Sequence, residues 1–319
     1  MRGVRVAVIA GALLWAPATA AAAEKPVVVT GAAANLQPTT VVLNGAVNPR
    51  GAATTYFFQY GTTRLFGVNT PAAWAGGGNA RVRVAVPVGA LAPFTTYHYR
   101  LVAQNAQGLT LGARRTFRTR RQPLGVSLTA SPNPVKVGGV TTLAGVLSGT
   151  GNAGRDVVVK SNPWPYTQGF LPVGNTLVTN PDGSFSQTIA SVPVNTQFLV
   201  QMPARPEVVS PIVVVGATAK VTRRVSVNRG ERRGRLRFRG RITPAVDGRA
   251  VIIQKLRRHG SGGWYNVGRS FARHTGKGYS SYRKTIRQRR GGRYRVLVEM
   301  NDIYSPSASR SIKIRRVRR

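Results

Sequence analysis

The chain has 319 residues, of which 47 are Lys or Arg and 8 are Asp or Glu, so its formal net charge is +39 at pH 7. It contains no cysteine, which excludes a disulfide-stapled scaffold and thiolate chemistry. Eight carboxylates and three histidines are a small inventory for acid–base or metal chemistry, whereas the positive charge favours anionic partners.

A targeting signal is predicted at the start of the chain, over residues 1–23. Arg2 and Arg5 precede an apolar run from Val6 to Trp15, and small residues follow as far as Ala23. This order is typical of a cleavable signal peptide, and the apolar run is shorter than the roughly 20 residues that a spanning helix needs. We therefore expect a secreted or extracytoplasmic protein, including one associated with the cell wall, with no transmembrane segment.

The remainder of the sequence favours an all-β fold. Apolar residues alternate with polar ones in short stretches that Gly, Pro and Asn interrupt, and no long stripe of helical period is present. Nearly 300 residues provide enough chain for two or three domains of about 100 to 150 residues each. The sequence predicts three tandem β-sandwich modules, at 24–120, 121–216 and 217–319.

The first module carries a distinctive segment at Leu91–Gly108, in which alternate residues are expected to face the core. The inward set is predicted to be Tyr97, Tyr99, Leu101 and Ala103, and the outward set His98, Arg100, Val102 and Gln104. With Leu43–Pro49 and Tyr60–Thr63, this segment resembles the fibronectin type III family, in a variety common in exported bacterial proteins. The resemblance implies a sandwich in which the Tyr97 hydroxyl bonds to nearby backbone, and it implies nothing about a ligand.

The second and third modules match each other at a nearly constant spacing. Gly154–Lys160 corresponds to Gly248–Gln254, an offset of 94 residues (248 − 154), and Ser210 corresponds to Ser309. Both segments resemble bacterial immunoglobulin-like domains, which implies a sandwich for each. The boundary between them is expected at 216–220, where the charge density rises.

Positive charge is concentrated in the third module, since residues 216–319 hold 30 basic and 4 acidic side chains, a net of +26 (30 − 4). In Arg235–Ile242 arginines alternate with apolar residues, so a strand would bury Leu236, Phe238 and Ile242 and display guanidinium groups about 6.6–6.8 Å apart. A second stripe is expected on the opposite sheet. The candidate anion-binding residues are Arg235, Arg237, Arg239, Arg241, Arg283, Arg287, Arg293 and Arg295.

Guanidinium forks bind phosphate oxygens bidentately. The expected partners are anionic cell-wall polymers or other envelope components, because an exported chain meets these first. Nonspecific binding of nucleic acid is an alternative, and no signature of sequence-specific recognition is present. A purely structural interpretation also stands, because alternating arginines form an ordinary solvent face that protects sheet edges.

Aromatic residues in predicted hairpin loops offer a second type of site. Exposed rings in such loops could stack on sugars, although a tryptophan in a sandwich hairpin more commonly covers the end of a core. The candidate sugar-stacking residues are Trp164, Tyr166 and Trp264.

An enzyme is not expected. The acidic residues are scattered, and only Glu299 and Asp302 lie close in sequence; His98 has outward parity, and His259 and His274 fall in predicted loops. We predict no catalytic residue, metal site or cofactor. The favoured function is a noncatalytic, exported cell-envelope protein for binding, adhesion or spacing, with a carbohydrate-binding accessory module and an extracellular nucleic-acid binder as alternatives.

Overall fold

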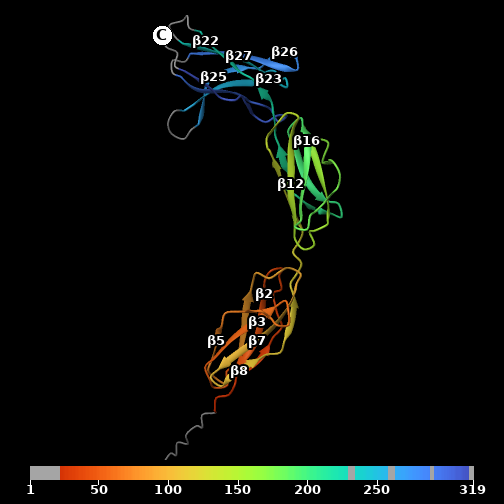
Figure 1. The fold of residues 1–319 in the computed structure, drawn as a ribbon, viewed down its shortest axis with the longest axis vertical. Helices are drawn as coiled ribbons and strands as arrows, with labels where there is room; N and C mark the ends of the chain where they lie inside the picture. Colours follow the sequence, from red (N-terminus) through yellow and green to blue (C-terminus); the bar gives the residue numbers. More distant parts are fainter. Residues whose placement is uncertain (1–21, 229–233, 258–262, 288–290, 316–319) are drawn as a thin grey trace, which may run out of the picture. The chain divides into compact units, whose positions relative to one another are not determined.

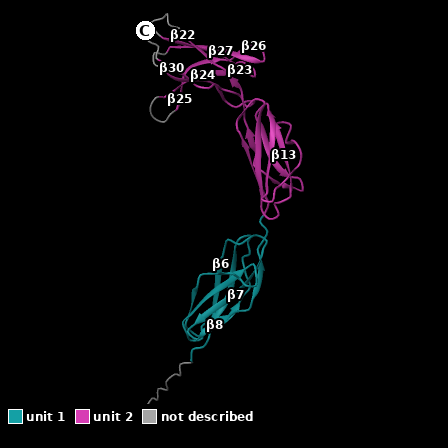
Figure 2. Ribbon diagram, in the orientation of Figure 1, with its two compact units in different colours: residues 1–122 teal, residues 123–319 magenta. Residues whose placement is uncertain are grey.

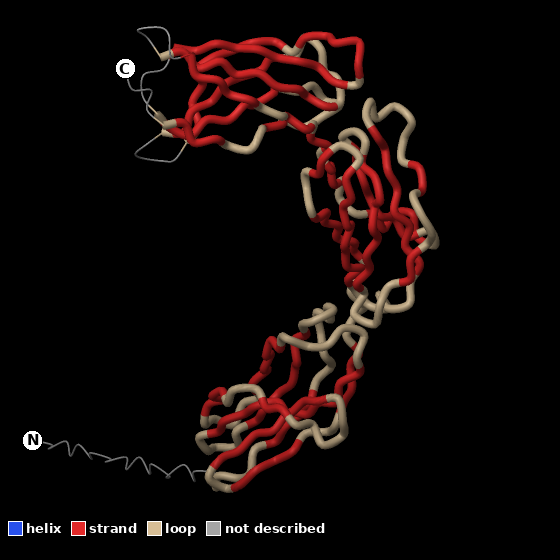
Figure 3. The backbone as a smooth tube through the Cα atoms, turned by 45° about the horizontal axis from the view of Figure 1, so that its top comes forward, coloured by secondary structure: helices blue, strands red, loops and turns tan. Residues whose placement is uncertain are grey.

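The computed structural model describes residues 22–228, 234–257, 263–287 and 291–315. The predicted all-β fold is confirmed, because every regular element in these ranges is a strand (Figure 3). None of the described residues belongs to a helix long and apolar enough to span a bilayer. The predicted signal peptide, apart from its last two residues, lies outside the described ranges and stays a prediction.

The chain forms two compact units, residues 1–122 and 123–319 (Figure 2). Unit 1 has one hydrophobic core, and unit 2 has two. The predicted modules at 121–216 and 217–319 therefore lie mostly within one compact unit, each around a core of its own. The chain is a tandem array of β-sandwiches, in which two sheets enclose each core.

Unit 1 is a sandwich of two antiparallel sheets (Figure 1). The smaller sheet has the order β1–β2–β6, with β1 (Val27–Thr30), β2 (Val41–Asn48) and β6 (Val82–Val88). The larger sheet has the order β4–β3–β7–β8, with β4 (Val68–Asn69), β3 (Thr54–Gly61), β7 (Thr96–Asn105) and β8 (Gly108–Leu111); β5 (Ala73–Gly76) also pairs with β3, and β9 (Arg115–Arg118) with β7. Leu43, Phe58 and Leu101 are fully buried between the sheets.

The predicted bond between the Tyr97 hydroxyl and nearby backbone is confirmed, since this hydroxyl accepts a hydrogen bond from the Ala92 backbone N–H at 2.9 Å. The inward set of β7 is buried as expected. Val102 was predicted to face outward, but it is also buried. It lies on the central strand between its register neighbours Phe57 and Leu111, which flank it on both sides.

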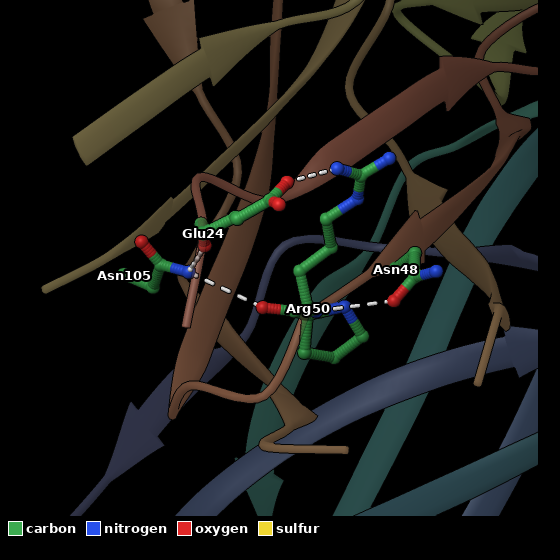
Figure 4. Close-up of polar contacts among 5 residues, drawn as sticks. Glu24, Asn48, Arg50 and Asn105 are labelled. Carbon is green, nitrogen blue, oxygen red and sulfur yellow. Dashed lines mark hydrogen bonds and ion pairs between the residues drawn. The ribbon is translucent and has the colours of Figure 1, made fainter. Parts of the chain in front are cut away.

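A polar cluster fixes the first described residues to the turn after β2 (Figure 4). The Glu24 carboxylate pairs with the Arg50 guanidinium, and the Arg50 backbone N–H donates to Asn48 Oδ1 at 3.0 Å. The Asn105 amide donates to the Glu24 carbonyl at 2.7 Å and to the Pro49 carbonyl at 3.2 Å. Asn105 thereby satisfies two backbone carbonyls that no strand pairing reaches.

The first sandwich of unit 2 repeats this plan. One sheet has the order β10–β12–β16, with β10 (Gly125–Ser131), β12 (Gly139–Ser148) and β16 (Ser184–Val192). The other has the order β14–β13–β17–β18, with β14 (Leu171–Pro172), β13 (Asp156–Pro163), β17 (Thr196–Met202) and β18 (Arg205–Val209); β15 (Leu177–Val178) pairs with β13, and β19 (Val213–Val215) with β17. Parallel strands β11 (Val135–Lys136) and β20 (Ala217–Thr218) close one edge.

The second sandwich of unit 2 carries most of the positive charge. One sheet has the order β21–β23–β27–β26, with β21 (Lys220–Val221), β23 (Arg235–Thr243), β27 (Tyr279–Arg287) and β26 (Arg273–Lys277); β22 (Arg224–Asn228) also pairs with β23. The other has the order β25–β24–β28–β29, with β25 (Trp264–Phe271), β24 (Ala250–Leu256), β28 (Gly292–Val298) and β29 (Ser307–Ala308); β30 (Ile312–Ile314) pairs with β28.

The sequence repeat is confirmed at the level of strands and hydrogen bonds. Strand β13 pairs with β17 in the first sandwich as β24 pairs with β28 in the second. The Ser210 hydroxyl accepts from the Val200 N–H at 2.9 Å, and the Ser309 hydroxyl accepts from the Val296 N–H at 3.0 Å. Each serine side chain therefore replaces a backbone acceptor in the hydrogen-bond ladder of its own sandwich.

Asn195 joins the two sandwiches of unit 2. Its side-chain oxygen accepts from the Ala217 N–H at 2.8 Å and from the Ser305 hydroxyl at 3.1 Å, and its amide donates to the Asp302 carbonyl at 2.7 Å. Its own backbone N–H donates to the Ile303 carbonyl at 2.8 Å. Every polar group of this side chain and its N–H is thus used at the junction.

Candidate anion-binding groove

Strand β23 has the two faces that the sequence predicts. Leu236, Phe238 and Ile242 are at most 1 % exposed and pack in the core of the second sandwich. The arginines between them lie on the opposite face, where Arg237, Arg239 and Arg241 are exposed and Arg235 is half-buried. The predicted alternation is therefore confirmed.

Strand register gathers arginines from four strands on this outer face. Arg239 lies opposite Arg224 of β22 on one side and opposite Arg283 of β27 on the other. Two residues further along β23, Arg241 lies opposite Ser281 of β27. Ser281 in turn lies opposite Arg273 of β26, so Arg241 and Arg273 belong to one row across the sheet. Directly opposed residues of an antiparallel pair share a face and contact each other, so these arginines form two adjacent rows.

The two rows line a groove with a volume of about 880 Å³. We call it the arginine groove and define it by Arg224, Arg239, Arg241, Arg273 and Arg283. Its other lining residues include Arg223, Thr222, Thr275, Tyr279 and Ser281, and the described lining residues include no Asp or Glu. In the described part of the chain, no ion pair joins any of the five arginines to a carboxylate. No described carboxylate therefore compensates the positive charge of these five arginines.

The backbone at Thr222 shapes one end of the groove. Thr222 lies between β21 and β22, and its hydroxyl accepts from the Arg241 N–H at 2.9 Å. Gly240 permits this close approach of Thr222, since a Cβ there would lie 2.0 Å from the Thr222 carbonyl oxygen. That carbonyl accepts from the Tyr282 hydroxyl at 2.8 Å. Burial raises the pKa of Tyr282, which favours the protonated phenol that donates this bond.

Tyr279 positions one of the groove arginines. The guanidinium carbon of Arg241 lies 4.6 Å from the centre of the Tyr279 ring, a distance typical of a cation–π contact. The Tyr279 carbonyl in turn accepts from the Thr275 hydroxyl. Arg241 is therefore ordered by contacts that leave its side chain on the groove.

Three of the predicted arginines lie on the same sheet face but outside the groove. Arg235 is opposite Arg287, and Arg237 is opposite Thr285. Three arginines that line the groove were not predicted from the sequence: Arg223, and Arg224 and Arg273 on β22 and β26. The signal for Arg224 was the alternation of Arg224 and Ser226 with valines, which predicts an outward arginine on a strand.

The remaining two predicted arginines lie on the opposite sheet, as expected. Arg293 is exposed on β28. Arg295 donates through Nε to Gln254 Oε1 at 2.8 Å, and its guanidinium carbon lies 4.4 Å from the centre of the Trp264 ring. Burial lowers the pKa of Arg295. The structure thus separates these arginines from the groove and engages Arg295 in packing.

The candidate sugar-stacking residues do not form one platform. One face of the Trp264 ring is covered by the guanidinium just described. Trp164 is half-buried, and its backbone N–H donates to the Asn195 carbonyl at 3.0 Å, beside the junction of the two sandwiches. Tyr166 is also half-buried, and burial together with the charge of Asp302 raises its pKa. Trp164 and Tyr166 therefore lie beside the junction, in another sandwich than Trp264.

Asp247 has two polar partners near the edge of the arginine sheet. It accepts from the Ser280 hydroxyl and lies against His274 Nδ1, both at 2.5 Å. The Ser280 bond and then the His274 bond lower the pKa of Asp247. Ser280 is fully buried and bonds to the carboxylate instead of the histidine, so the group lacks the nucleophile–base contact of a hydrolytic site.

The other acids and histidines are dispersed. Glu299 lies 3.8 Å from Arg269 on the sheet opposite the groove, and His98 is half-buried on β7. His259 lies outside the described residues. Within the described ranges, no three His, Asp or Glu side chains are placed to hold a metal ion.

No family model matches the chain, and no curated protein matches it. Solved structures similar to it include domains A168-A170 from titin, at 16 % identity over 91 % of this chain and 99 % of that chain, with a TM-score of 0.38. The chicken CNTN1 FN1-FN3 domains match at 16 % identity over 90 % and 96 %, with a TM-score of 0.30. A tetra-tandem repeat in the extending region of a large adhesion protein matches at 13 % identity over 92 % and 74 %, with a TM-score of 0.29.

Proposed function

We propose that the chain is a noncatalytic, exported cell-envelope protein for binding, adhesion or spacing, and that its basic surface attracts anionic polymers. The observation that carries the proposal is the arginine groove, in which the five arginines that define it and Arg223 line one cavity, with no carboxylate among the described lining residues. Tandem sandwiches supply a scaffold that presents this surface.

The charge distribution supports the proposal. Residues 216–319 carry a net charge of +26, and a polyanion that binds such a surface releases the counterions condensed along it. Clustered charge of one sign also raises the rate of encounter with oppositely charged partners. Binding driven in this way weakens steeply as salt is added.

The expected location of the chain ranks the candidate polyanions. The predicted signal peptide would deliver the chain to an envelope where anionic wall polymers are abundant, and nucleic acid is the second source of the same charge. Neutral carbohydrate ranks lower, because Trp264 lies under Arg295 and Trp164 lies beside the Asn195 junction.

Retention on immobilised polymers tests this function. The purified chain, without residues 1–23, would be passed over poly(glycerol phosphate), DNA and a neutral polysaccharide across a series of salt concentrations. We expect retention on both anionic polymers, loss of that retention as salt rises, and no retention on the neutral polysaccharide. Retention on the neutral polysaccharide alone, unaffected by salt, would contradict the proposal. Cell fractionation followed by a salt wash of the wall fraction tests the location.

A further inference from the structure

We infer that the arginine groove is a dedicated site for two successive phosphate groups of an extended polyphosphodiester. This inference rests on the proposed function and names the ligand class of one part of the basic surface. It differs from diffuse attraction, in which every exposed arginine of the sandwich would contribute equally.

The first phosphate position is the row formed by Arg224, Arg239 and Arg283. Register places these residues directly opposite one another on three adjacent strands, and adjacent strands lie about 4.7–4.9 Å apart. Long arginine side chains from such close backbones can converge on a single group. A tetrahedral phosphate presents its oxygens in three dimensions to several guanidinium forks at once, whereas a carboxylate presents only two oxygens in one plane.

The second phosphate position is the row of Arg241 and Arg273. It lies two residues along the strands from the first row, which corresponds to about 6.6–6.8 Å and is close to the repeat of an extended polyphosphodiester. Ser281 lies between the two arginines and lines the groove with a hydroxyl. The Tyr279 ring contacts the Arg241 guanidinium. The Arg241 side chain is therefore partly ordered in the free protein and loses less conformational entropy when the ligand binds.

Three variants of the full mature chain test the inference. The groove variant combines Arg224→Gln, Arg239→Gln and Arg283→Gln, and a second variant places Lys at the same positions. The control combines Arg249→Gln, Arg257→Gln and Arg310→Gln, which are exposed residues of the same sandwich that do not line the groove. Groove and control variants therefore lose the same charge from the same sandwich. Circular dichroism and thermal melting establish that all three fold.

The probes are a synthetic oligo(glycerol phosphate), a single-stranded oligonucleotide of equal charge and oligoglutamate of equal charge. We expect the groove variant to bind the oligo(glycerol phosphate) at least about tenfold more weakly and to lower the log–log salt slope by about 0.7, since the three arginines form one phosphate position and each lost phosphate contact on a single strand contributes about 0.7. The Lys variant should keep the slope but bind about threefold more weakly, because lysine lacks the fork. The control should stay within about twofold at 0.15 M salt, where screening is strong.

The outcomes separate the two proposals. Equal loss in the groove and control variants, or equally tight binding of oligoglutamate by the unmodified chain, overturns the dedicated site and leaves the proposed function standing. Absence of salt-dependent binding by the unmodified chain to any anionic probe overturns the proposed function itself. Preference for the glycerol phosphate or for the oligonucleotide supports the site in either case and identifies the source of the phosphodiester.

Discussion

At the scale of single residues, the Asn105 side chain is expected to stabilise the packing of the first described residues of unit 1 against the turn after β2. It is buried, donates to the carbonyls of Glu24 and Pro49, and accepts from the Gln107 N–H at 2.9 Å. Asn105→Ala leaves the carbonyls of Glu24 and Pro49 without this donor, at a cost of about 1–3 kcal/mol. Native-state hydrogen exchange of the β1 amides should accelerate by about tenfold or more.

The matched control for this change is Asn79→Ala, because Asn79 is exposed in a loop of the same unit. It should leave exchange in β1 unchanged. Equal protection of β1 in the Asn105 variant and the unmodified chain would show that the β1–β2 ladder, with the Glu24–Arg50 contacts, holds these residues without the asparagine.

Residue-scale prediction from sequence was successful where the partner is local. The Tyr97 hydroxyl finds the Ala92 N–H five residues away, and the family resemblance was enough to place it. Arg295 shows the opposite case, because its partners Gln254 and Trp264 lie 41 and 31 residues away in sequence (295 − 254 and 295 − 264). Alternation places a residue on a face of a strand but does not identify its neighbours on the adjoining strands.

At the scale of elements, the two faces of β23 should differ sharply in their contribution to stability. Phe238 is fully buried against Tyr294, with ring centres 5.8 Å apart, so Phe238→Ala is expected to cost about 3–5 kcal/mol. Arg237 is exposed one residue away, and Arg237→Ala should change stability by less than about 0.5 kcal/mol. Hydrogen exchange of the β27 amides measures both. Comparable losses in the two variants would mean that the arginine face also stabilises the fold.

The arginine groove could be predicted only in part from the sequence. Alternation in Arg235–Ile242 identified Arg239 and Arg241 as outward residues, because strand period is a property of one segment. Arg224 and Arg273 join them through the register of β22 with β23 and of β26 with β27. Register depends on which strands pair and where their turns lie, and the close approach of Thr222 to Gly240 at one end of the groove joins two different strand connections. None of these pairings can be read from one strand alone.

At the scale of the whole molecule, the repeat between the second and third modules was predictable because equal spacing survives in the sequence. The junction between them was not predictable. Tyr304 packs against both cores of unit 2, and Thr218 forms a parallel bridge with Ser305. These contacts join residues about 90 positions apart through loops that carry no periodic pattern. Asn195 bonds to Ala217 and Ser305, which are next to or part of these contacts.

Removing the Asn195 side chain should therefore loosen the two sandwiches of unit 2 without unfolding either. Asn195→Ala loses the bonds to Ala217, Ser305 and Asp302, each worth about 0.5–1.5 kcal/mol, while both cores keep their apolar contacts. The Ala217 amide should exchange at least about tenfold faster, and spin labels on the two sandwiches should give a broader distance distribution. Asn180→Ala, in an exposed hairpin of the first sandwich, should change neither quantity. Unchanged exchange at Ala217 would mean that Tyr304 and the backbone bridge hold the junction, because these contacts do not depend on the asparagine.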